Sequence, residues 1–427
     1  MRPDRAGAVA VKSSKPMWAW AAYDWANSAF ATSVLVAFFP VFFARYWGSD
    51  LSGQDSTFWL GIGSSVASLL VALLSPMLGA VADRGGLKKR LLAVMTALGV
   101  AGTAALCWIG PGAWGWAMTA FVIAQVGFAL GISFYDALIV DVCEPAQRHR
   151  VSALGYALGY LGGGLLLVVH VVMTLKPAWF GLPDATAAVR VAFGSVALWW
   201  VLFSLPLFRH VRESRPPVSV PVMQAALGAL RQLAKTLRRL RQYPDVVTFL
   251  IAYWLYIDGV HTIARMAVDY GAKLGFDTNA LIQALVITQF VGFPATLLMA
   301  RLAGRVGTRP ALFVSIAIYI AVTVWGFFLQ TQAQFFVMAA VIGLVQGSVQ
   351  ALSRSYFSVL IPAERAGEFF GFYNMMGKFA AVLGPVLVGV SAVVTGSSRL
   401  SILSIAVLFI LGMVCLLRVR PAEEGRR

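Results

Sequence analysis

The chain of 427 residues is 59% hydrophobic and only 12% charged, about half the charge of a soluble domain, with a mean hydropathy of +0.78. These values exclude a water-soluble enzyme and leave room for about twelve membrane spans, since one span takes about 20 apolar residues. The net charge of +16 indicates the basic cytoplasmic loops of a membrane protein rather than a nucleic-acid-binding surface.

Apolar runs separated by polar or Gly- and Pro-rich segments predict an all-α polytopic membrane protein with twelve transmembrane helices. The first six are expected at residues 18–46, 57–80, 90–110, 114–141, 150–175 and 189–208. The second six are expected at residues 246–271, 279–301, 310–329, 334–361, 367–394 and 400–417. Three isolated cysteines lack metal or disulfide spacing and are interpreted as small buried hydrophobes: Cys107, Cys143 and Cys415.

A long polar stretch separates the sixth expected helix from the seventh. Within it, residues 223–241 alternate apolar and basic side chains at helical spacing. This pattern fits a basic amphipathic helix on an anionic membrane surface and, equally well, a solvated linker helix. The expected organisation is a tail at 1–16, a bundle at 17–209, a linker at 210–245, a second bundle at 246–419 and a tail at 420–427.

Charge alternates between the loops. Residues 110–113 and 330–334 carry no charge, whereas residues 83–90 and 301–309 are basic. Because Lys and Arg collect in cytoplasmic loops, we expect both termini in the cytoplasm and a multi-pass protein of the inner or plasma membrane. The basic N-terminal tail leads into an aromatic-rich run without a clear cleavage site, which argues against a removed signal peptide.

The two halves of the sequence resemble each other. Gly127, Gly131 and Gly155 each have a counterpart glycine 216 residues later, and the loop EPAQR at 144–148 resembles IPAER at 361–365. Agreement of glycines, loop chemistry and order indicates duplication of a six-helix unit, and therefore two pseudo-symmetric six-helix bundles. Such duplication is typical of secondary transporters, whose site lies between the halves.

The loop between the second and third expected helices, GAVADRGG at 79–86 followed by KKR at 88–90, closely resembles the signature loop of the major facilitator superfamily. Its glycines permit a tight turn. Asp83 can meet the positive N-terminal end of a neighbouring helix, and Arg84 and Arg90 can pair with an acid, for which Asp141 is the natural candidate. We interpret it as a conformational latch rather than an ordinary basic loop. The candidate latch residues are Gly79, Asp83, Arg84, Gly86, Arg90 and Asp141.

Four further blocks carry a narrower resemblance. They are YDWANSAF at 23–30, YIDGV at 256–260, QGSVQALSRS at 346–355 and EFFGFYN at 368–374. Together they resemble the vacuole-effluxer branch of that superfamily, and specifically its bacterial members, over nearly the whole chain. The resemblance implies the twelve-helix major facilitator fold and solute efflux. It implies amino acids as cargo only by analogy with fungal members, which release amino acids from the vacuole.

Ionisable residues lie inside four of the apolar spans, where each costs roughly 3 kcal/mol or more. Asp24, Asp136, Asp258 and Arg354 fall on the first, fourth, seventh and tenth expected helices, which line the central cavity in the resembled superfamily. A structural hydrogen-bonding role is the alternative to a functional one. We expect Arg354 to be held by Asp136 or Asp24, in a pair that opens to bind a solute carboxylate.

Polar neighbours complete the candidate substrate and proton-coupling set. The neutral members are Asn27, Tyr135, Gln346 and Gln350. The glutamines suit either solute binding or helix–helix hydrogen bonding. His261 follows Asp258 at i+3 on one helix face, so the two could pair and share a proton. His170 is expected to be a satisfied packing histidine.

The sequence lacks the motifs of several other classes of protein. The sequence has no phosphate-binding loop and no Ser-His-Asp, HExxH or CxxC arrangement, so we expect neither an enzyme nor a cofactor or metal site. The prediction is a monomeric secondary active transporter that exports a small polar solute, with amino acids one candidate, coupled to protons. The partners are the solute, protons and the lipid bilayer, without nucleic acid. The alternatives are an exporter of amphipathic or lipid-like molecules and a non-transporting membrane sensor or scaffold.

Overall fold

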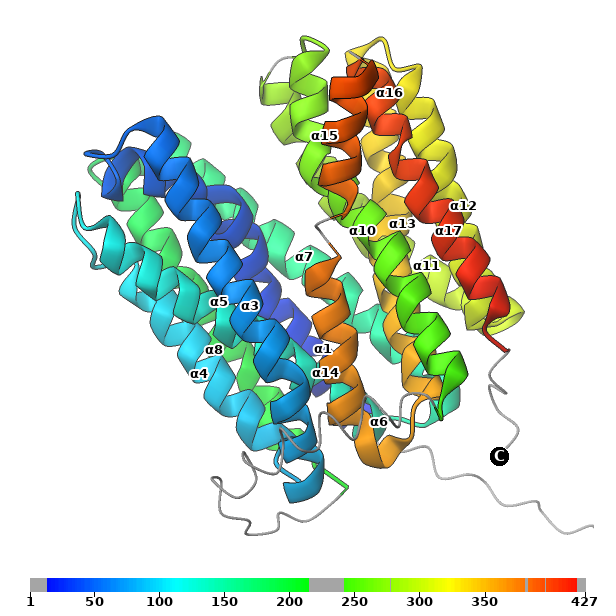
Figure 1. The fold of residues 1–427 in the computed structure, drawn as a ribbon. Helices are drawn as coiled ribbons and strands as arrows, with labels where there is room; N and C mark the ends of the chain where they lie inside the picture. Colours follow the sequence, from blue (N-terminus) through cyan, green and yellow to red (C-terminus); the bar gives the residue numbers. More distant parts are fainter. Residues whose placement is uncertain (1–13, 215–241, 277, 381–382, 396, 421–427) are drawn as a thin grey trace, which may run out of the picture.

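The computed structural model describes residues 14–214, 242–276, 278–380, 383–395 and 397–420, and these are almost entirely helical. Two helical bundles lie side by side, one from each half of the chain (Figure 1). The amphipathic helix expected at residues 223–241 lies outside the described residues.

The first bundle opens with a span that changes its helix type. It runs from α1 (Ser14–Ala29) through the π-helical η1 (Phe30–Phe38), α2 (Phe39–Phe42) and the π-helical η2 (Phe43–Trp47). Pro40 lies in α2 and cannot donate a backbone hydrogen bond, which favours irregular turns around it. The bundle continues with α3 (Gly53–Gly85), α4 (Lys88–Ala105), α5 (Trp114–Ala137), α6 (Ile139–Val142), η3 (Pro145–Gln147), α7 (Arg148–Leu175), η4 (Pro177–Phe180) and α8 (Ala185–His210).

The second bundle follows the linker. Its elements are α10 (Pro244–Lys273), α11 (Thr278–Val306), α12 (Thr308–Phe327), α13 (Gln332–Leu360), η5 (Ala363–Arg365), α14 (Ala366–Phe379), α15 (Leu383–Thr395), α16 (Ser398–Leu403) and α17 (Ile405–Arg418). Some helix starts in both bundles are capped by side chains. Ser52, Asp184 and Thr331 each accept a hydrogen bond from the backbone N–H three residues later.

Ten helices in the described part of the chain are long and apolar enough to cross a membrane. The other two expected spans are α4, which starts with three basic residues, and the α14–α15 pair. The continuous helix expected at 367–394 is wrong, because the span is divided into α14 and α15. Pro385 lies in the first turn of α15, a position where the missing N–H of proline suits the start of a helix.

The buried histidine and the cysteines contribute to packing. His170 is buried, and its two ring nitrogens form hydrogen bonds with the hydroxyl groups of Ser33 (2.9 Å) and Ser195 (2.7 Å). Cys143 is buried, whereas Cys107 and Cys415 are half-buried, and none of the three forms a disulfide in the described part of the chain. The packing role expected of His170 is therefore confirmed.

The halves meet mainly where α3 lies along α14 and α7 lies along α11. Glycines allow the first of these contacts: a Cβ atom on Gly79 would lie 2.2 Å from the carbonyl oxygen of Gly367, and one on Gly371 would lie 2.7 Å from the Cα of Pro76. We call the end of the molecule that carries this contact the latch end. From there the two bundles diverge toward α15 and α16 (Figure 1).

Candidate functional site

Arg354 projects from α13 of the second half and is bound by side chains of the first half. Its Nη1 lies 3.0 Å from Asp136 Oδ1, and its Nη2 lies 3.2 Å from Asp24 Oδ2. The Nε donates to the Ser152 hydroxyl group and Nη2 to the Ser152 carbonyl, both at 2.8 Å. A second bond from Nη1 to Asp24 brings the total to five, so every N–H of the guanidinium has an acceptor.

Aromatic rings enclose the same guanidinium. The Arg354 Cζ lies 4.3 Å from the ring centre of Tyr156 and 4.7 Å from that of Trp20. Trp20 stacks on Tyr135 at 4.3 Å, and the Tyr135 hydroxyl donates to Asp24 at 2.9 Å. Cation–π contacts and full hydrogen bonding together offset the cost of burying the charge.

The charge cluster, defined as Asp24, Asp136 and Arg354, lies almost completely out of solvent. The relative exposures are 8%, 2% and 1% in that order. Asn374 of α14 adds a hydrogen bond from Nδ2 to Asp136 Oδ2 at 3.2 Å. The cluster has two carboxyl groups for one guanidinium, so a single added proton makes it neutral. The expected pairing of Arg354 with an acid is present, and both candidate acids take part.

Gly155 of α7 provides the space for this cluster. A Cβ atom there would lie 2.4 Å from Asp24 Oδ2, 3.0 Å from the Tyr135 hydroxyl and 3.1 Å from Arg354 Nη2. The contact leaves no room for any side chain larger than hydrogen. One of the glycines of the internal repeat is therefore explained by the charge cluster.

The predicted neutral residues lie in different settings. Asn27 is 3% exposed, and its Nδ2 has no hydrogen-bond partner among the described residues. It lies one helical turn beyond Asp24 on α1. Gln350 donates from Nε2 to the carbonyl of Gln346 at 3.2 Å, within α13. Only Tyr135 of the four is bound directly to the charge cluster.

Asp258 and His261 lie at the break between α14 and α15. Asp258 is completely buried, and its oxygens accept the backbone N–H groups of Leu383 (3.0 Å) and Gly384 (2.9 Å). The Nδ1 of His261 donates to the carbonyl of Ala380 at 2.8 Å. The sequence suggested a pair of titrating cavity residues. The structure places Asp258 as the cap of α15 and His261 at the end of α14.

Asp83 joins the two halves at the latch end. Its oxygens accept the backbone N–H groups of Gly367 (2.9 Å) and Glu368 (2.7 Å), at the N-terminus of α14. A carboxylate there is favoured by the free N–H groups and by the helix dipole. The expectation that Asp83 meets a helix N-terminus is confirmed.

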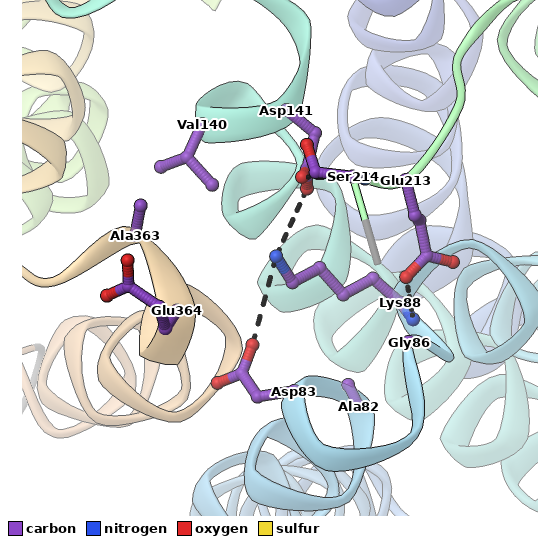
Figure 2. A pocket seen from close by; sticks show the side chains of 10 residues that line it. All are labelled: Ala82, Asp83, Gly86, Lys88, Val140, Asp141, Glu213, Ser214, Ala363 and Glu364. Carbon is purple, nitrogen blue, oxygen red and sulfur yellow. Dashed lines mark hydrogen bonds and ion pairs between the residues drawn. The ribbon is translucent and has the colours of Figure 1, made fainter. Parts of the chain in front are cut away.

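Lys88 provides the cation of the latch. Its Nζ lies 3.1 Å from Asp141 Oδ2 and 3.8 Å from Asp83 Oδ1 (Figure 2). The sequence offered Arg84 and Arg90 as partners for Asp141, whereas the partner that the structure shows is Lys88. Arg90 is exposed, and the side chain of Arg84 is outside the described residues. Gly86 forms the turn with φ +57°, in the left-handed region that favours glycine.

The start of the linker binds to the same place. Glu213 accepts the backbone N–H groups of Lys88 (3.1 Å) and Lys89 (2.8 Å), and the N–H of Ser214 donates to Asp141 at 3.2 Å. The pKa of Glu213 is raised above its ordinary value because the side chain is partly buried, and the two backbone N–H groups offset only part of this effect. These residues line a small hollow beside Lys88 (Figure 2). Sequence reasoning missed this contribution, because the linker was treated as a separate segment.

Two more hydrogen bonds connect the halves. Arg148 Nη1 donates to the carbonyl of Ser358, and the Ser152 hydroxyl donates to the carbonyl of Ala351 at 2.8 Å. Both run from α7 to α13. With the charge cluster and Asp83, they hold the bundles together at the latch end.

Two helical bundles, joined by a latch loop and a buried charge cluster, define a transporter of the major facilitator superfamily, which is not an enzyme. The chain matches a family model described as "Vacuole effluxer Atg22 like" over residues 54–143 and 140–427. It therefore belongs to the vacuole-effluxer family of that superfamily.

Three comparisons illustrate this relationship. The chain is 37% identical to the "Uncharacterized MFS-type transporter YxiO" of Bacillus subtilis, over 95% of each chain. It is 26% identical to "Autophagy-related protein 22" of Yarrowia lipolytica over 71% of this chain, spanning only 55% of that protein. The structure of the human organic anion transporter MFSD10 superposes with a TM-score of 0.72 at 14% identity, over 95% of this chain and all of the other. This last likeness concerns the fold.

Proposed function

We propose that the chain exports a small polar solute that carries a carboxylate, by proton-coupled alternating access across the plasma membrane. The observation that carries this proposal is Arg354, a cation of one half whose five N–H groups are bound within the other half. A group placed this way must change partners whenever the halves separate at the latch end.

All five N–H donors of the Arg354 guanidinium are bound, and this limits how a solute can bind to it. With all five donors in use, a carboxylate reaches Arg354 only by replacing an acceptor already bound, and Asp24 and Asp136 are the two acceptors that carry a carboxyl group. The planar guanidinium matches a carboxylate in two parallel hydrogen bonds, which the point charge of a lysine cannot do. The free Nδ2 of Asn27, one turn away on α1, is a buried donor for a further solute oxygen.

Charge balance links this exchange to protons. When a solute carboxylate takes the place of one aspartate, the displaced carboxyl group remains in a dry environment without its cation. An unpaired buried charge is costly, so uptake of a proton accompanies the exchange. Release of the solute reverses both steps, so solute and proton cross the membrane in the same direction, and export proceeds down the outward gradient of the solute.

Family membership favours amino acids as the solute class. They carry the carboxylate that the site needs, and the family model is named for a vacuole effluxer. The fungal relatives are longer than this chain, and the bacterial relative has no assigned substrate in its name. The assignment to amino acids therefore rests on chemistry and family together.

The proposal is tested by transport in liposomes that contain the purified protein. Each isotope-labelled standard amino acid is examined first for exchange across the membrane and then for accumulation driven by a pH gradient. Asp24→Asn should retain exchange but lose accumulation, because its amide cannot take up the proton. Asp184→Asn, the same change at the exposed cap of α8, is the control. Gradient-driven accumulation by Asp24→Asn at the wild-type level would contradict the coupling.

A further inference from the structure

The eleventh span is divided, and α10 binds both of its pieces. His261 holds the C-terminal end of α14 through the carbonyl of Ala380, and Asp258 holds the N-terminal end of α15 through two backbone N–H groups. The hydroxyl of Thr262 also donates to Asp258 at 3.2 Å. Two residues within one turn of α10 thus bind the two ends of the break, and Thr262 supports one of them.

The packing at this point is close. A Cβ atom on Gly384 would lie 1.8 Å from the hydroxyl oxygen of Thr262 and 2.8 Å from Asp258 Oδ1, and one on Gly377 would lie 3.2 Å from the hydroxyl of Tyr253. Both pieces therefore touch α10 through glycines. Pro385 disfavours a continuous helix, and Asp258 accepts two backbone N–H groups at the start of α15.

Away from its C-terminal end, α14 is attached to the other half of the molecule. It packs mainly along α3 and α5. Its first backbone N–H groups bind Asp83, and Asn374 in its third turn binds Asp136. The helix thus connects the latch at one end with the charge cluster at its middle and with α10 at its far end; Figure 1 shows α14 between the two bundles.

We propose that Asp258 and His261 are the hinge about which α14 swings when the latch end opens, while α15 stays with α10. This inference rests on the proposed transport function. Rotation about the Ala380 end would move the N-terminus of α14 away from Asp83 and carry Asn374 away from Asp136 in the same step. Opening of the latch and release of the charge cluster then occur together, because α14 binds both.

A swing of α14 about the hinge and a rigid-body rocking of the bundles predict different behaviour for one distance within the second half. Gln242, at the start of α10, and Glu364, just before α14, are both exposed, belong to the same half and lie in the described part of the chain. Their separation changes if α14 swings within its bundle and stays constant if the bundle moves as one body. Arg90 and Glu364, also exposed, lie in different halves and report opening of the latch end in either case.

The experiment measures both distances by pulsed electron paramagnetic resonance in liposomes. Spin labels are placed on Gln242→Cys with Glu364→Cys, or Arg90→Cys with Glu364→Cys, after replacement of the three native cysteines. Spectra are compared with and without an equimolar mixture of the standard amino acids and at two pH values. We expect both distances to respond to these changes. A response of the pair between halves with a constant Gln242–Glu364 distance would overturn the hinge but leave the transport proposal intact.

Hinge variants give the second test. Asp258→Asn keeps one acceptor oxygen for α15 and Asp258→Ala keeps none. Because these bonds anchor the pivot to α10, the Gln242–Glu364 distance distribution should broaden in Asp258→Asn and broaden further in Asp258→Ala. Thr248→Val on α10, which removes a hydroxyl bonded only within its own helix, is the control. Wild-type distance distributions in Asp258→Ala would overturn the hinge. An absence of transport, together with unchanging distances in the wild type, would overturn both proposals.

Discussion

Arg354 carries the strongest interaction between the halves. Removing one partner of a buried ion pair costs about 3–5 kcal/mol, since the remaining charge stays buried. Here the arginine has two acids, a serine and aromatic faces around it, so loss of one contact leaves others in place. This redundancy suits a site that exchanges partners during a transport cycle, because no single step exposes an unpaired guanidinium.

A single methyl group tests whether this arrangement must stay tightly packed. Gly155→Ala places a Cβ atom against Asp24, whereas Gly164→Ala on the same helix meets its nearest atom at 3.6 Å, an ordinary contact. Overpacking costs typically about 1–3 kcal/mol, which lowers the population of the intact cluster by about fivefold or more. Amino-acid exchange should fall accordingly in Gly155→Ala and stay unchanged in Gly164→Ala. Equal rates in both variants would contradict the role of the cluster.

The sequence predicted site residues correctly where a charged side chain lies within an apolar span. Asp24, Asp136 and Arg354 stood out because charges are rare in apolar spans, and the structure brings all three together. Ser152 and Asn374 gave no such signal, since small polar residues are common in membrane helices. Likewise, a run of three basic residues could not reveal that Lys88 is the one that binds Asp141.

The eleventh span shows the limits of periodicity at the scale of the element. Its apolar run predicted one helix, and Gly384-Pro385 was the only local sign of a break. That sign is ambiguous, because prolines within other spans, such as Pro76 in α3 and Pro206 in α8, leave their helices continuous. The side chains that stabilise the break, Asp258 and His261, come from another helix. Tertiary contacts of this kind cannot be read from the broken segment itself.

The contact of α3 with α14 provides a test at the same scale. Gly79→Ala forces a methyl group against the backbone of Gly367, whereas Gly61→Ala, also on α3, meets nothing within 4 Å. Because backbone cannot move aside as a side chain can, α3 and α14 must separate. We expect Gly79→Ala to favour the latch-open state in the Arg90–Glu364 distance measurement and Gly61→Ala to match the wild type. A closed latch in both variants would show that the close packing is not what holds it shut.

For the whole molecule, the repeat and the loop charges were enough to predict two helical bundles. The family match and the fold comparison support that architecture. What the repeat could not predict is the asymmetry between the halves. The first half supplies both acids and the second the arginine, so the central interaction crosses between the bundles. Helices at equivalent positions in the two halves carry different functional side chains. The internal repeat therefore predicts where the helices lie but not which residues interact.

Orientation in the membrane is a prediction of the loop charges. In a cysteine-free background, Ala333→Cys should react with an impermeant thiol reagent from outside and Arg305→Cys only from inside, because basic loops stay in the cytoplasm. Both positions are exposed. Thr308, in the same basic loop, is 2% exposed and unsuited to labelling. The reverse pattern of labelling would contradict the expected orientation of both termini.

The most direct test of the account is amino-acid exchange by Arg354→Lys in proteoliposomes, compared with the wild type at equal protein content. Lysine keeps the charge but cannot present the planar pair of donors to a carboxylate, so exchange should fall by at least about tenfold while the protein remains folded and inserted. Wild-type exchange by Arg354→Lys would contradict the claim that Arg354 binds the solute.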